Sequence, residues 1–267
     1  MSTYAKVVLV TGGSSGLGLA ICSRLAAMGH VVYGTSRKPD RDPSGWRLIA
    51  MDITDEASVR RGVEEVLLRE HRIDVVVNNA GLGIQGAAED TEVVLAQRLF
   101  DANLFGAHRV CRAVLPGMRD RKGGLIINIS SIAANFGLPY RAFYSASKAA
   151  LDRYSEALRI EVMPFGVKVV SVQPGGFKTN IASSRLKPDL ISTHYQKGYT
   201  RAMEVLSSSL LNASDPDELA QLVAKIIASP NPGTIYRAAQ GVEKLSVLLK
   251  KLLPGRWFEG MVGKHLG

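Results

Sequence analysis

The sequence predicts an α/β fold built on one doubly wound parallel sheet of about seven strands, with helices on both faces. Three observations support this prediction. Short apolar, often β-branched runs alternate with stretches of helical periodicity along most of the chain. These runs are apolar throughout rather than at every second residue, which is typical of parallel strands buried on both faces. With 267 residues, 46% of them hydrophobic, the chain is long enough to bury a sizeable core.

The expected strands and helices can be placed in order along the chain. The first strand runs into glycines and precedes a helix that ends at Gly29. The second helix has acidic residues in its first turn, where the helix dipole favours them. Connections between parallel strands are expected to be right-handed. The expected strands are 6–13, 30–36, 46–54, 73–81, 124–131, 167–175 and 234–239, and the helices are 15–29, 55–70, 89–120, 142–163 and 216–229.

Composition narrows the class of protein. The formal net charge is +9, but the positive residues are scattered and no stacking aromatics lie among them, so we expect no nucleic-acid partner. No apolar run approaches the roughly 20 residues that span a bilayer, and the N-terminus lacks the features of a signal peptide. Cys22 and Cys111 lie far apart and form no C-x-x-C pair. A reducing, cytoplasmic location and no metal site are therefore expected.

The glycines after the first strand predict a phosphate-binding loop. In "TGGSSGLG", residues 11–18, glycines let the backbone turn tightly and approach a ligand. The helix that follows offers free N–H groups and the positive end of its dipole to a phosphate. This is the arrangement of a Rossmann-type dinucleotide site, although a tight turn without a ligand is the alternative. The residues expected to bind phosphate are Gly12, Ser14, Ser15, Gly16, Leu17 and Gly18.

The end of the second strand indicates which dinucleotide is bound. Many such sites have an acidic residue here, which accepts hydrogen bonds from the adenosine ribose. This chain has Ser36, Arg37 and Lys38 instead. A guanidinium can hold a 2′-phosphate through paired, charge-assisted hydrogen bonds, whereas an acid would repel it. We therefore predict NADP(H) in preference to NAD(H); the alternative is a solvated basic loop.

A tyrosine and a lysine suggest acid–base chemistry. Tyr144 and Lys148 are four residues apart and so share a helix face. A free tyrosine has a pKa of about 10, and a nearby ammonium lowers that pKa toward the working range. Ser131 ends the fifth strand and could hydrogen-bond a substrate oxygen while the tyrosine supplies the proton. The tyrosine–lysine spacing alone is common by chance, and Ser131 could simply bond to backbone.

Seven motifs in order resemble those of the short-chain dehydrogenase/reductase family, over residues 5–240. They are "TGGSSGLG", "DIT" at 52–54, "NNAG" at 78–81, "DANLFG" at 101–106, "INISS" at 127–131, "YSASK" at 144–148 and "PGGFKT" at 174–179. The resemblance implies a single dinucleotide-binding and catalytic domain, residues 1–267. It also implies an oxidoreductase that transfers a hydride between a nicotinamide cofactor and a carbonyl or secondary alcohol. The resemblance further implies a homodimer or homotetramer, commonly formed through the helices around 91–120 and 142–163, where the apolar Phe100, Phe105 and Leu151 fit an interface.

The resemblance also implies roles for individual residues. Tyr144 would be the general acid or base, Lys148 would lower its pKa and bind the nicotinamide ribose, and Ser131 rather than Ser130 would orient the carbonyl. Asn103 would sit at a helix break and anchor a water-linked proton relay. Read singly, Asn103 could be an ordinary helix residue. The further cofactor contacts implied are adenosine-side lining by Asn79, Ala80 and Gly81, adenine flanking by Asp52 and Ile53, and nicotinamide contacts from Pro174, Gly175 and Thr179.

Two segments bear on the substrate. In this family, residues equivalent to 181–214 form a lid, and here they include Leu186, Pro188, Tyr195 and Tyr199. We therefore predict an apolar, steroid-, retinoid- or lipid-like substrate, unless these residues pack only on their own protein. The tail, 242–267, is leucine-rich, basic and expected to be helical; it resembles tails of hydroxysteroid and retinol dehydrogenases. Packing or lid closure is expected before membrane contact.

Other classes of protein remain as alternatives. A non-catalytic NADP(H)-binding sensor would keep the glycine loop but would not need Tyr144 and Lys148. A sugar-nucleotide epimerase of the related extended type would share the tyrosine–lysine spacing but usually has a longer C-terminal domain. Turnover of a carbonyl with NADPH distinguishes these alternatives from the expected reductase.

Overall fold

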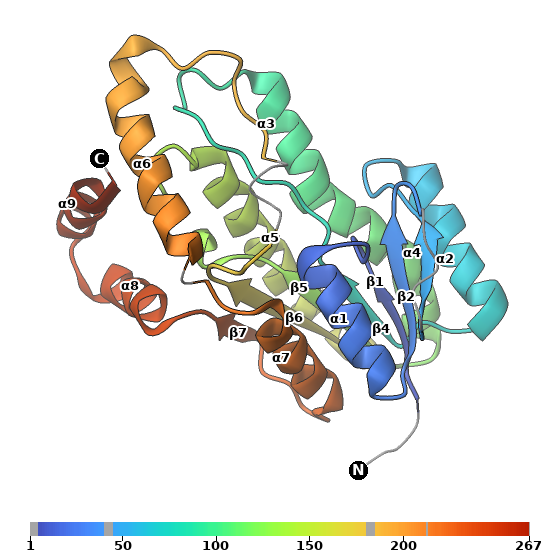
Figure 1. Cartoon of the computed structure of the whole chain (residues 1–267). Coiled ribbons are helices and arrows are strands. Elements are labelled where there is room, and N and C mark those ends of the chain that lie inside the picture. Colours follow the sequence, from blue (N-terminus) through green and yellow to red (C-terminus); the bar gives the residue numbers. More distant parts are fainter. Residues whose placement is uncertain (1–4, 40–44, 180–184, 212, 267) are drawn as a thin grey trace.

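The computed structural model describes residues 5–39, 45–179, 185–211 and 213–266. Within them, seven parallel strands form one sheet in the order β3-β2-β1-β4-β5-β6-β7 (Figure 1). The strand order reverses between β1 and β4, so ligands are expected beyond the carboxyl ends of these strands. The predicted doubly wound sheet is confirmed. The strands are β1 (Val7–Val10), β2 (Val31–Ser36), β3 (Arg47–Ala50), β4 (Val75–Asn78), β5 (Gly124–Ile129), β6 (Val167–Pro174) and β7 (Ile235–Ala238).

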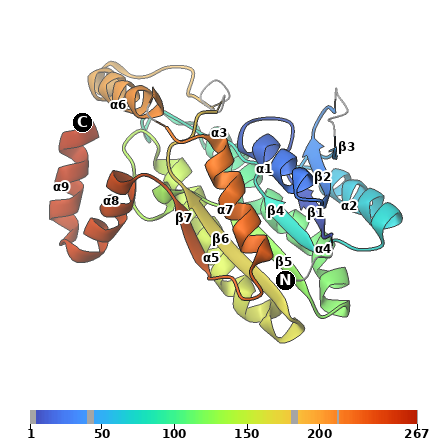
Figure 2. The same ribbon diagram turned by 60° about the horizontal axis from the view of Figure 1, so that its bottom comes forward.

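Helices cover both faces of this sheet (Figures 1 and 2). On one face, α1 and α7 pack on Val8 and Val10. On the other, α2, α4 and α5 pack on Val7 and Leu9. Each fully buried Val or Leu side chain contributes about 1.5–3 kcal/mol to folding. The helices are α1 (Gly16–Ala27), α2 (Glu56–Glu70), α3 (Val93–Phe100), α4 (Gly106–Asp120), α5 (Ala142–Val162), α6 (Thr193–Leu211), α7 (Pro216–Ala228), α8 (Gly241–Leu252) and α9 (Gly255–Leu266).

The expected helix over 89–120 is two helices joined by a π-helical segment. This segment, Asp101–Phe105, lies between α3 and α4 and includes the buried Asn103. A π-helical turn inserts an extra residue into the i→i−4 pattern and is frequent at functional sites. The break expected at Asn103 is therefore a change of helical pitch rather than an end of the helix.

The expected lid segment contains α6, which packs against the residues before α5. The Tyr140 and Tyr199 rings meet edge to face, with their centroids 5.9 Å apart. His194 is exposed. Residues 181–184 and 212 of the expected lid lie outside the described residues. The contribution of the lid to substrate binding stays a prediction.

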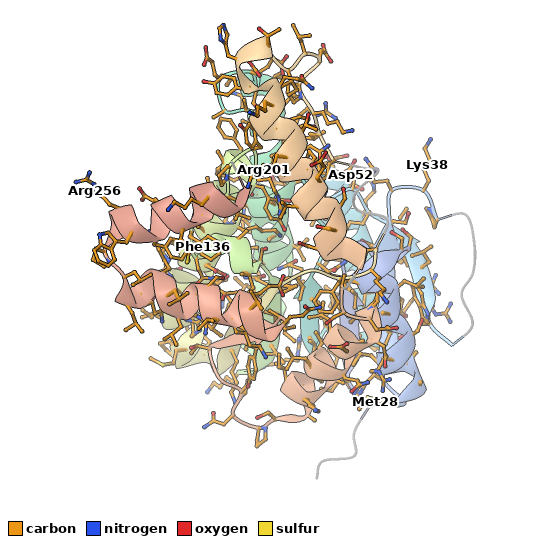
Figure 3. All side chains as sticks on the ribbon, turned by 60° about the vertical axis from the view of Figure 1, so that its left-hand side comes forward. Met28, Lys38, Asp52, Phe136, Arg201 and Arg256 are labelled. Atoms are coloured by element: carbon orange, nitrogen blue, oxygen red, sulfur yellow. The ribbon has the colours of Figure 1, made fainter. Side chains whose placement is uncertain are left out.

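The tail forms α8 and α9, and it packs on the rest of the protein. Phe258 is only 1% exposed, and its ring meets that of Phe136 edge to face at 5.1 Å between centroids. Arg201 of α6 donates a hydrogen bond to the backbone oxygen of Lys264 at 3.2 Å. Figure 3 shows Phe136 beside the two tail helices. These contacts favour packing of the tail over free exposure at a membrane surface.

Candidate active site

The glycine loop links β1 to the N-terminus of α1 and leaves room for a ligand. Gly12 has a φ of 68°, in the left-handed region that favours glycine. A Cβ on Gly18 would lie 2.1 Å from the Gly12 oxygen, so only glycine permits this close turn. The first turn of α1 contains no acidic residue. Its positive dipole end is therefore available to an anion above the loop.

The residues after β4 hold this loop in place. Asn79 donates a side-chain hydrogen bond to the Thr11 oxygen at 2.9 Å. The Thr11 hydroxyl in turn accepts from the backbone nitrogens of Asn79 and Ala80, both at 3.0 Å. Asn79 and Ala80 thus brace the phosphate loop from the neighbouring strand. Asn78 is buried and hydrogen-bonds Asn128 of β5 at 2.8 Å, which gives it a structural role in the sheet.

Arg37 and Lys38, the basic residues after β2, are exposed. They follow the strand that neighbours β1, which leads into the glycine loop. The Ser36 hydroxyl accepts from the backbone nitrogen of Lys38 at 3.3 Å, which shapes this turn. Lys38 projects away from the protein (Figure 3). Burial opposes ionisation of Asp52, but two hydrogen bonds from Thr54 and the positive charge of Arg37 keep the pKa of Asp52 below its usual value. Arg37 therefore lies near Asp52. Ile53 is half-buried and packs on α4 at Gly106.

Asn103 connects three segments around the expected catalytic residues. Its side-chain oxygen accepts from the backbone nitrogen of Leu82 at 2.7 Å, and its nitrogen donates to the Leu82 oxygen at 3.0 Å. The same nitrogen lies 3.0 Å from the Ser147 hydroxyl on α5. The side chain thus positions the loop after Gly81 relative to α5. The proton relay expected at Asn103 stays a prediction.

Tyr144 lies near several positive charges. Burial alone would raise the pKa of Tyr144, but Lys148, Arg141, hydrogen bonding to Ser131 and the charge of Arg185 together lower it. The hydroxyl of Ser131 also accepts from the backbone nitrogen of Ala133 at 3.1 Å. Ser130 instead lies 3.2 Å from the Lys148 backbone oxygen. Ser131, and not Ser130, is the serine that contributes to the lowered pKa of Tyr144.

Lys148 is buried and fixed on the same helix face. Its ammonium donates to the Ile129 backbone oxygen at 2.9 Å. A Cβ on Gly81 would lie 3.6 Å from that ammonium, which places the loop after β4 beside it. Burial lowers the pKa of Lys148, and Tyr144 and Asp152 oppose that shift. The arrangement can transfer a proton at Tyr144 and stabilise the phenolate that remains.

The sequence reasoning did not identify a buried polar chain behind Lys148. Asp152 lies one helical turn further along α5, and its carboxylate accepts from Gln173 at 2.7 Å. Asn135, in the loop that follows Ser131, donates to Gln173 at 3.1 Å. Burial raises the pKa of Asp152, and its hydrogen bonds and the Lys148 charge oppose that shift. The spacing of Lys148 and Asp152 was visible in the sequence, but their common burial was not.

The turn after β6 is held by the tail, which the sequence reasoning also missed. Glu243 accepts from the backbone nitrogen of Gly176 at 2.9 Å and from that of Gln240, the N-cap of α8, also at 2.9 Å. A Cβ on Gly175 would lie 2.0 Å from a Glu243 carboxylate oxygen. Thr179 lies against Gly16 of the phosphate loop. Thr179 therefore lies at the glycine loop, and the cofactor contacts expected of Pro174, Gly175 and Thr179 stay a prediction.

We expect Glu243→Gln to weaken both the fold and cofactor binding. The amide can accept only at its oxygen, so it loses one of two charge-assisted bonds, worth about 1–2 kcal/mol. Each kcal/mol of lost stability lowers Tm by about 2–4 °C. Thermal unfolding and NADPH titration would measure these effects. Glu259→Gln, in the exposed part of α9, is the matched control. Unchanged Tm and affinity in Glu243→Gln would contradict this role.

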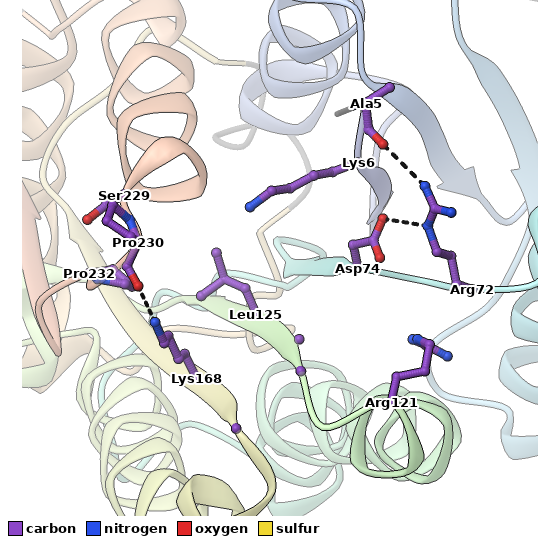
Figure 4. A pocket seen from close by; sticks show the side chains of 13 residues that line it. Ala5, Lys6, Arg72, Asp74, Arg121, Leu125, Lys168, Ser229, Pro230 and Pro232 are labelled. Carbon is purple, nitrogen blue, oxygen red and sulfur yellow. Dashed lines mark hydrogen bonds and ion pairs between the residues drawn. The ribbon is translucent and has the colours of Figure 1, made fainter. Parts of the chain in front are cut away.

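A hollow lies at the amino ends of the strands, at the other end of the sheet from the glycine loop (Figure 4). It has a volume of about 620 Å³ and is lined at the amino ends of β1, β4, β5 and β6. Its positive side chains already have partners. Lys6 donates to the Ile227 oxygen, Arg121 to the Ile73 oxygen, and Arg72 to Asp74. The hollow lies away from the carboxyl ends of the strands, where ligands bind in doubly wound folds, and none of the predicted site residues line it.

Three further features of the described residues concern metal ions, membranes and thiols. Across 5–39, 45–179, 185–211 and 213–266, no three His, Cys, Asp or Glu side chains gather as a possible metal site. Within the same ranges, no helix is both long and apolar enough to cross a bilayer. Cys22 and Cys111 are buried free thiols, and burial raises the pKa of each. Neither thiol is therefore poised to react as a thiolate.

Comparison with known proteins identifies the family. The sequence model described as short chain dehydrogenase matches residues 6–189. The chain belongs to this family. The short-chain dehydrogenase described here is 40% identical to a 3-ketodihydrosphingosine reductase of Bacteroides thetaiotaomicron over 252 residues, which cover 93% of each chain. It is 32% identical to an uncharacterized oxidoreductase of Bacillus subtilis, over 98% of each chain.

Solved structures of other short-chain dehydrogenases share the fold. One from Streptomyces avermitilis superposes with a TM-score of 0.83 at 35% identity, covering 94% of each chain. A 3-ketoacyl-(acyl-carrier-protein) reductase from Brucella melitensis, complexed with NADH, has a TM-score of 0.76 at 26% identity and covers 91% of this chain and 100% of its own. A short chain dehydrogenase from Burkholderia cenocepacia, in complex with NADP, has a TM-score of 0.75 at 26% identity, with each chain covered completely.

Proposed function

We propose that this short-chain dehydrogenase is an NADP(H)-dependent oxidoreductase that interconverts a carbonyl compound and a secondary alcohol. The observation that carries the proposal is the placement of Tyr144 on α5 one helical turn before the buried Lys148, where Lys148, Arg141 and hydrogen bonding to Ser131 lower the pKa of its hydroxyl. A group with its pKa brought toward the working pH is suited to general acid–base catalysis. In reduction, Tyr144 donates its proton to the carbonyl oxygen as negative charge develops there. Ser131 hydrogen-bonds the same oxygen, and Lys148 stabilises the phenolate left on Tyr144.

The glycine loop and the turn after β6 fit a nicotinamide dinucleotide. Gly12 and Gly18 allow the close turn of the loop, since a Cβ on Gly18 would clash with the Gly12 oxygen, and the N-terminus of α1 offers its positive dipole end to a pyrophosphate there. Asn79 and Ala80 brace this loop from the end of β4, and Gly81, the next residue, lies beside Lys148. When bound, the nicotinamide supplies the hydride, and the protein supplies orientation and the proton.

The preference for NADP(H) rests on Arg37, and it can be tested directly. We expect Arg37→Ala to weaken NADPH binding about tenfold to a hundredfold, because charge-assisted hydrogen bonds to a 2′-phosphate are lost. NADH binding should change little, so the relative preference for NADH rises. Fluorescence titration with both cofactors measures this. Arg60→Ala on the exposed side of α2 is the control. An unchanged ratio of the two affinities would defeat the assignment.

The substrate is proposed to be a lipid-like carbonyl compound. The lid sequence is rich in apolar and aromatic residues, and α6 and α9 close over the segment between Ser131 and Tyr144 through Tyr199 and Phe258. The similarity to a 3-ketodihydrosphingosine reductase supports a carbonyl on a long-chain compound. Hydroxysteroids and retinoids also belong to this proposed class of lipid-like substrates.

A panel of carbonyls and alcohols, assayed with both nicotinamides, tests the proposal. It should span steroids, retinoids, quinones, acyl thioesters, long-chain ketones and sugars. Turnover of at least one apolar carbonyl with NADPH is expected. Tight NADPH binding without turnover of any member would favour the non-catalytic sensor instead.

A homodimer or homotetramer is also proposed. A shallow apolar hollow of about 450 Å³ lies on α3 and the segments beside it, where Phe100, Phe105 and Phe143 contribute. Phe105 is 50% exposed and Val93 is 70% exposed, so this surface could pack on another copy. Leu151, which the sequence suggested for the same surface, is 1% exposed and belongs to the core of the subunit. Light scattering would determine the oligomeric state.

A further inference from the structure

Two arginines, Arg141 and Arg185, lie near Tyr144, the group proposed to protonate the carbonyl. Arg141 precedes α5, and its guanidinium carbon lies 4.6 Å from the centroid of the Tyr144 ring. Its Nε atom is buried and has no hydrogen-bond partner among the described residues. Arg185 is half-buried and close enough for the charge of Arg141 to act on it. In the described residues, no carboxylate pairs with either guanidinium in a salt bridge.

One loop holds both arginines in place. Residues 83–86 follow β4, and Gly86 donates a backbone hydrogen bond to the Tyr140 oxygen at 2.9 Å, directly before Arg141. The same loop pairs with Leu186, which donates to the Gly83 oxygen at 2.9 Å and accepts from Gln85 at 3.0 Å. The side-chain stem of Arg185 lies over Gly83, where a Cβ would be 2.9 Å from its Cγ. Both cations are therefore presented by fixed backbone beside Tyr144.

Two such charges are costly without a counter-ion. Burial lowers the pKa of Arg141 and of Arg185, and the charge of Arg141 lowers that of Arg185 further. The groups that favour their charged forms are tyrosines, Tyr144 for both and Tyr199 for Arg185. Buried charged groups are normally paired and hydrogen-bonded, and guanidinium pairs bind planar anions well. An anionic group of the ligand would supply the missing partner.

We propose that Arg141 and Arg185 bind a carboxylate or phosphate of the substrate, adjacent to the carbonyl that Tyr144 protonates. This inference rests on the proposed function. It makes the substrate an amphiphile, with an anionic group near the reacting carbon and an apolar remainder under α6 and α9. An amphiphile with an ammonium at that position, such as the compound in the name of the 3-ketodihydrosphingosine reductase, would be disfavoured by the same two charges. The proposed substrate therefore shares with that compound the ketone and the long chain but not the head group.

Matched ligands that need no turnover test the proposal. Octanoate, octyl phosphate, 1-octanol and octylammonium share one chain and differ in the head group. Calorimetric titration of the NADP⁺-loaded protein should give at least one anion about tenfold or more tighter than octanol. Octylammonium should be the weakest ligand. Octanoate and octyl phosphate binding about as weakly as octanol would overturn the proposal.

Variants of the two arginines test whether they cause the preference for anions. Arg141→Gln and Arg185→Gln should each weaken binding of the preferred anion about tenfold or more and leave octanol unchanged. Arg153→Gln, exposed on the same helix as Tyr144, is the charge-matched control and should bind as the natural protein does. If Arg141→Gln fails to fold, Arg185→Gln and Arg185→Met carry the test. Unchanged anion affinity in the folded variants would refute the site.

The binding assay and the turnover assay distinguish failure of the proposed anion site from failure of the proposed reaction. Arginine-dependent anion binding without turnover of any carbonyl would refute the proposed reaction but keep the anion site. Turnover of neutral and anionic carbonyls with equal kcat/KM, together with anion affinity that is unaffected in the variants, would refute the anion site and keep the reaction.

Discussion

Replacing Tyr144 with phenylalanine should lower kcat by about 10²–10⁴-fold, the usual contribution of a positioned general acid. The ring remains to fill its place beside Arg141, so the fold should survive. The substitution removes only the hydroxyl, whose pKa Lys148 and Ser131 help to lower. NADPH affinity should be nearly unchanged, because the change leaves the glycine loop and the end of β2 intact. Steady-state rates on an accepted carbonyl and a cofactor titration would measure both quantities.

Tyr154→Phe is the matched control, because it removes a tyrosine hydroxyl outside the candidate active site. Tyr154 lies on α5 and its hydroxyl is 3.1 Å from Nδ1 of His108, so Tyr154→Phe removes a hydroxyl with a hydrogen-bond partner. Loss of this hydrogen bond should lower the free energy of unfolding by about 1 kcal/mol and leave kcat close to normal. Near-normal turnover in Tyr144→Phe would refute the proposed acid–base scheme. Equal losses in the two variants would instead point to a general effect on the fold.

Much of the fold was predictable because its signals are local. Apolar runs without alternation require strands buried on both faces, and each such run up to Val167–Pro174 became a strand of the parallel sheet. Gly12 and Gly18 indicated a close backbone turn, and the structure leaves no room for a side chain at Gly18. Tyr144 and Lys148 share a helix face by spacing alone. These features depend on residues near one another in the chain.

Other features of the site were not predictable, because they arise from contacts between distant segments. Glu243 and Gly176 are 67 residues apart, and no local pattern connects the first turn of α8 to the turn after β6. Arg185 comes close to Tyr144 only because Leu186 pairs with the loop after β4. Leu151 has the apolar character of an interface residue, but burial by its own subunit places it in the core. Burial and long-range pairing decide such cases.

The pH dependence of a Lys148→Met variant tests the electrostatic part of the proposal. Lys148 is the largest of the influences that lower the pKa of Tyr144, ahead of Arg141, Ser131 and Arg185. Without this ammonium the pKa of Tyr144 rises, because only Arg141, Ser131 and Arg185 are left to oppose burial. In reduction the tyrosine must carry its proton, so the rate falls as pH passes that pKa. In oxidation it must be deprotonated, so the rate rises until that pKa is passed. The inflection should therefore move to higher pH in both directions.

We expect kcat/KM for oxidation at neutral pH to fall about 10²-fold or more in Lys148→Met, because less tyrosine is ionised and the phenolate loses its stabilising charge. The Ile129 oxygen also loses its hydrogen bond from the ammonium, so Tm should be measured alongside the rates. Lys225→Met, on the exposed side of α7, is the control for loss of a positive charge. An inflection that stays in place while the rate falls would mean that Lys148 acts only by binding the cofactor and does not lower the pKa of Tyr144.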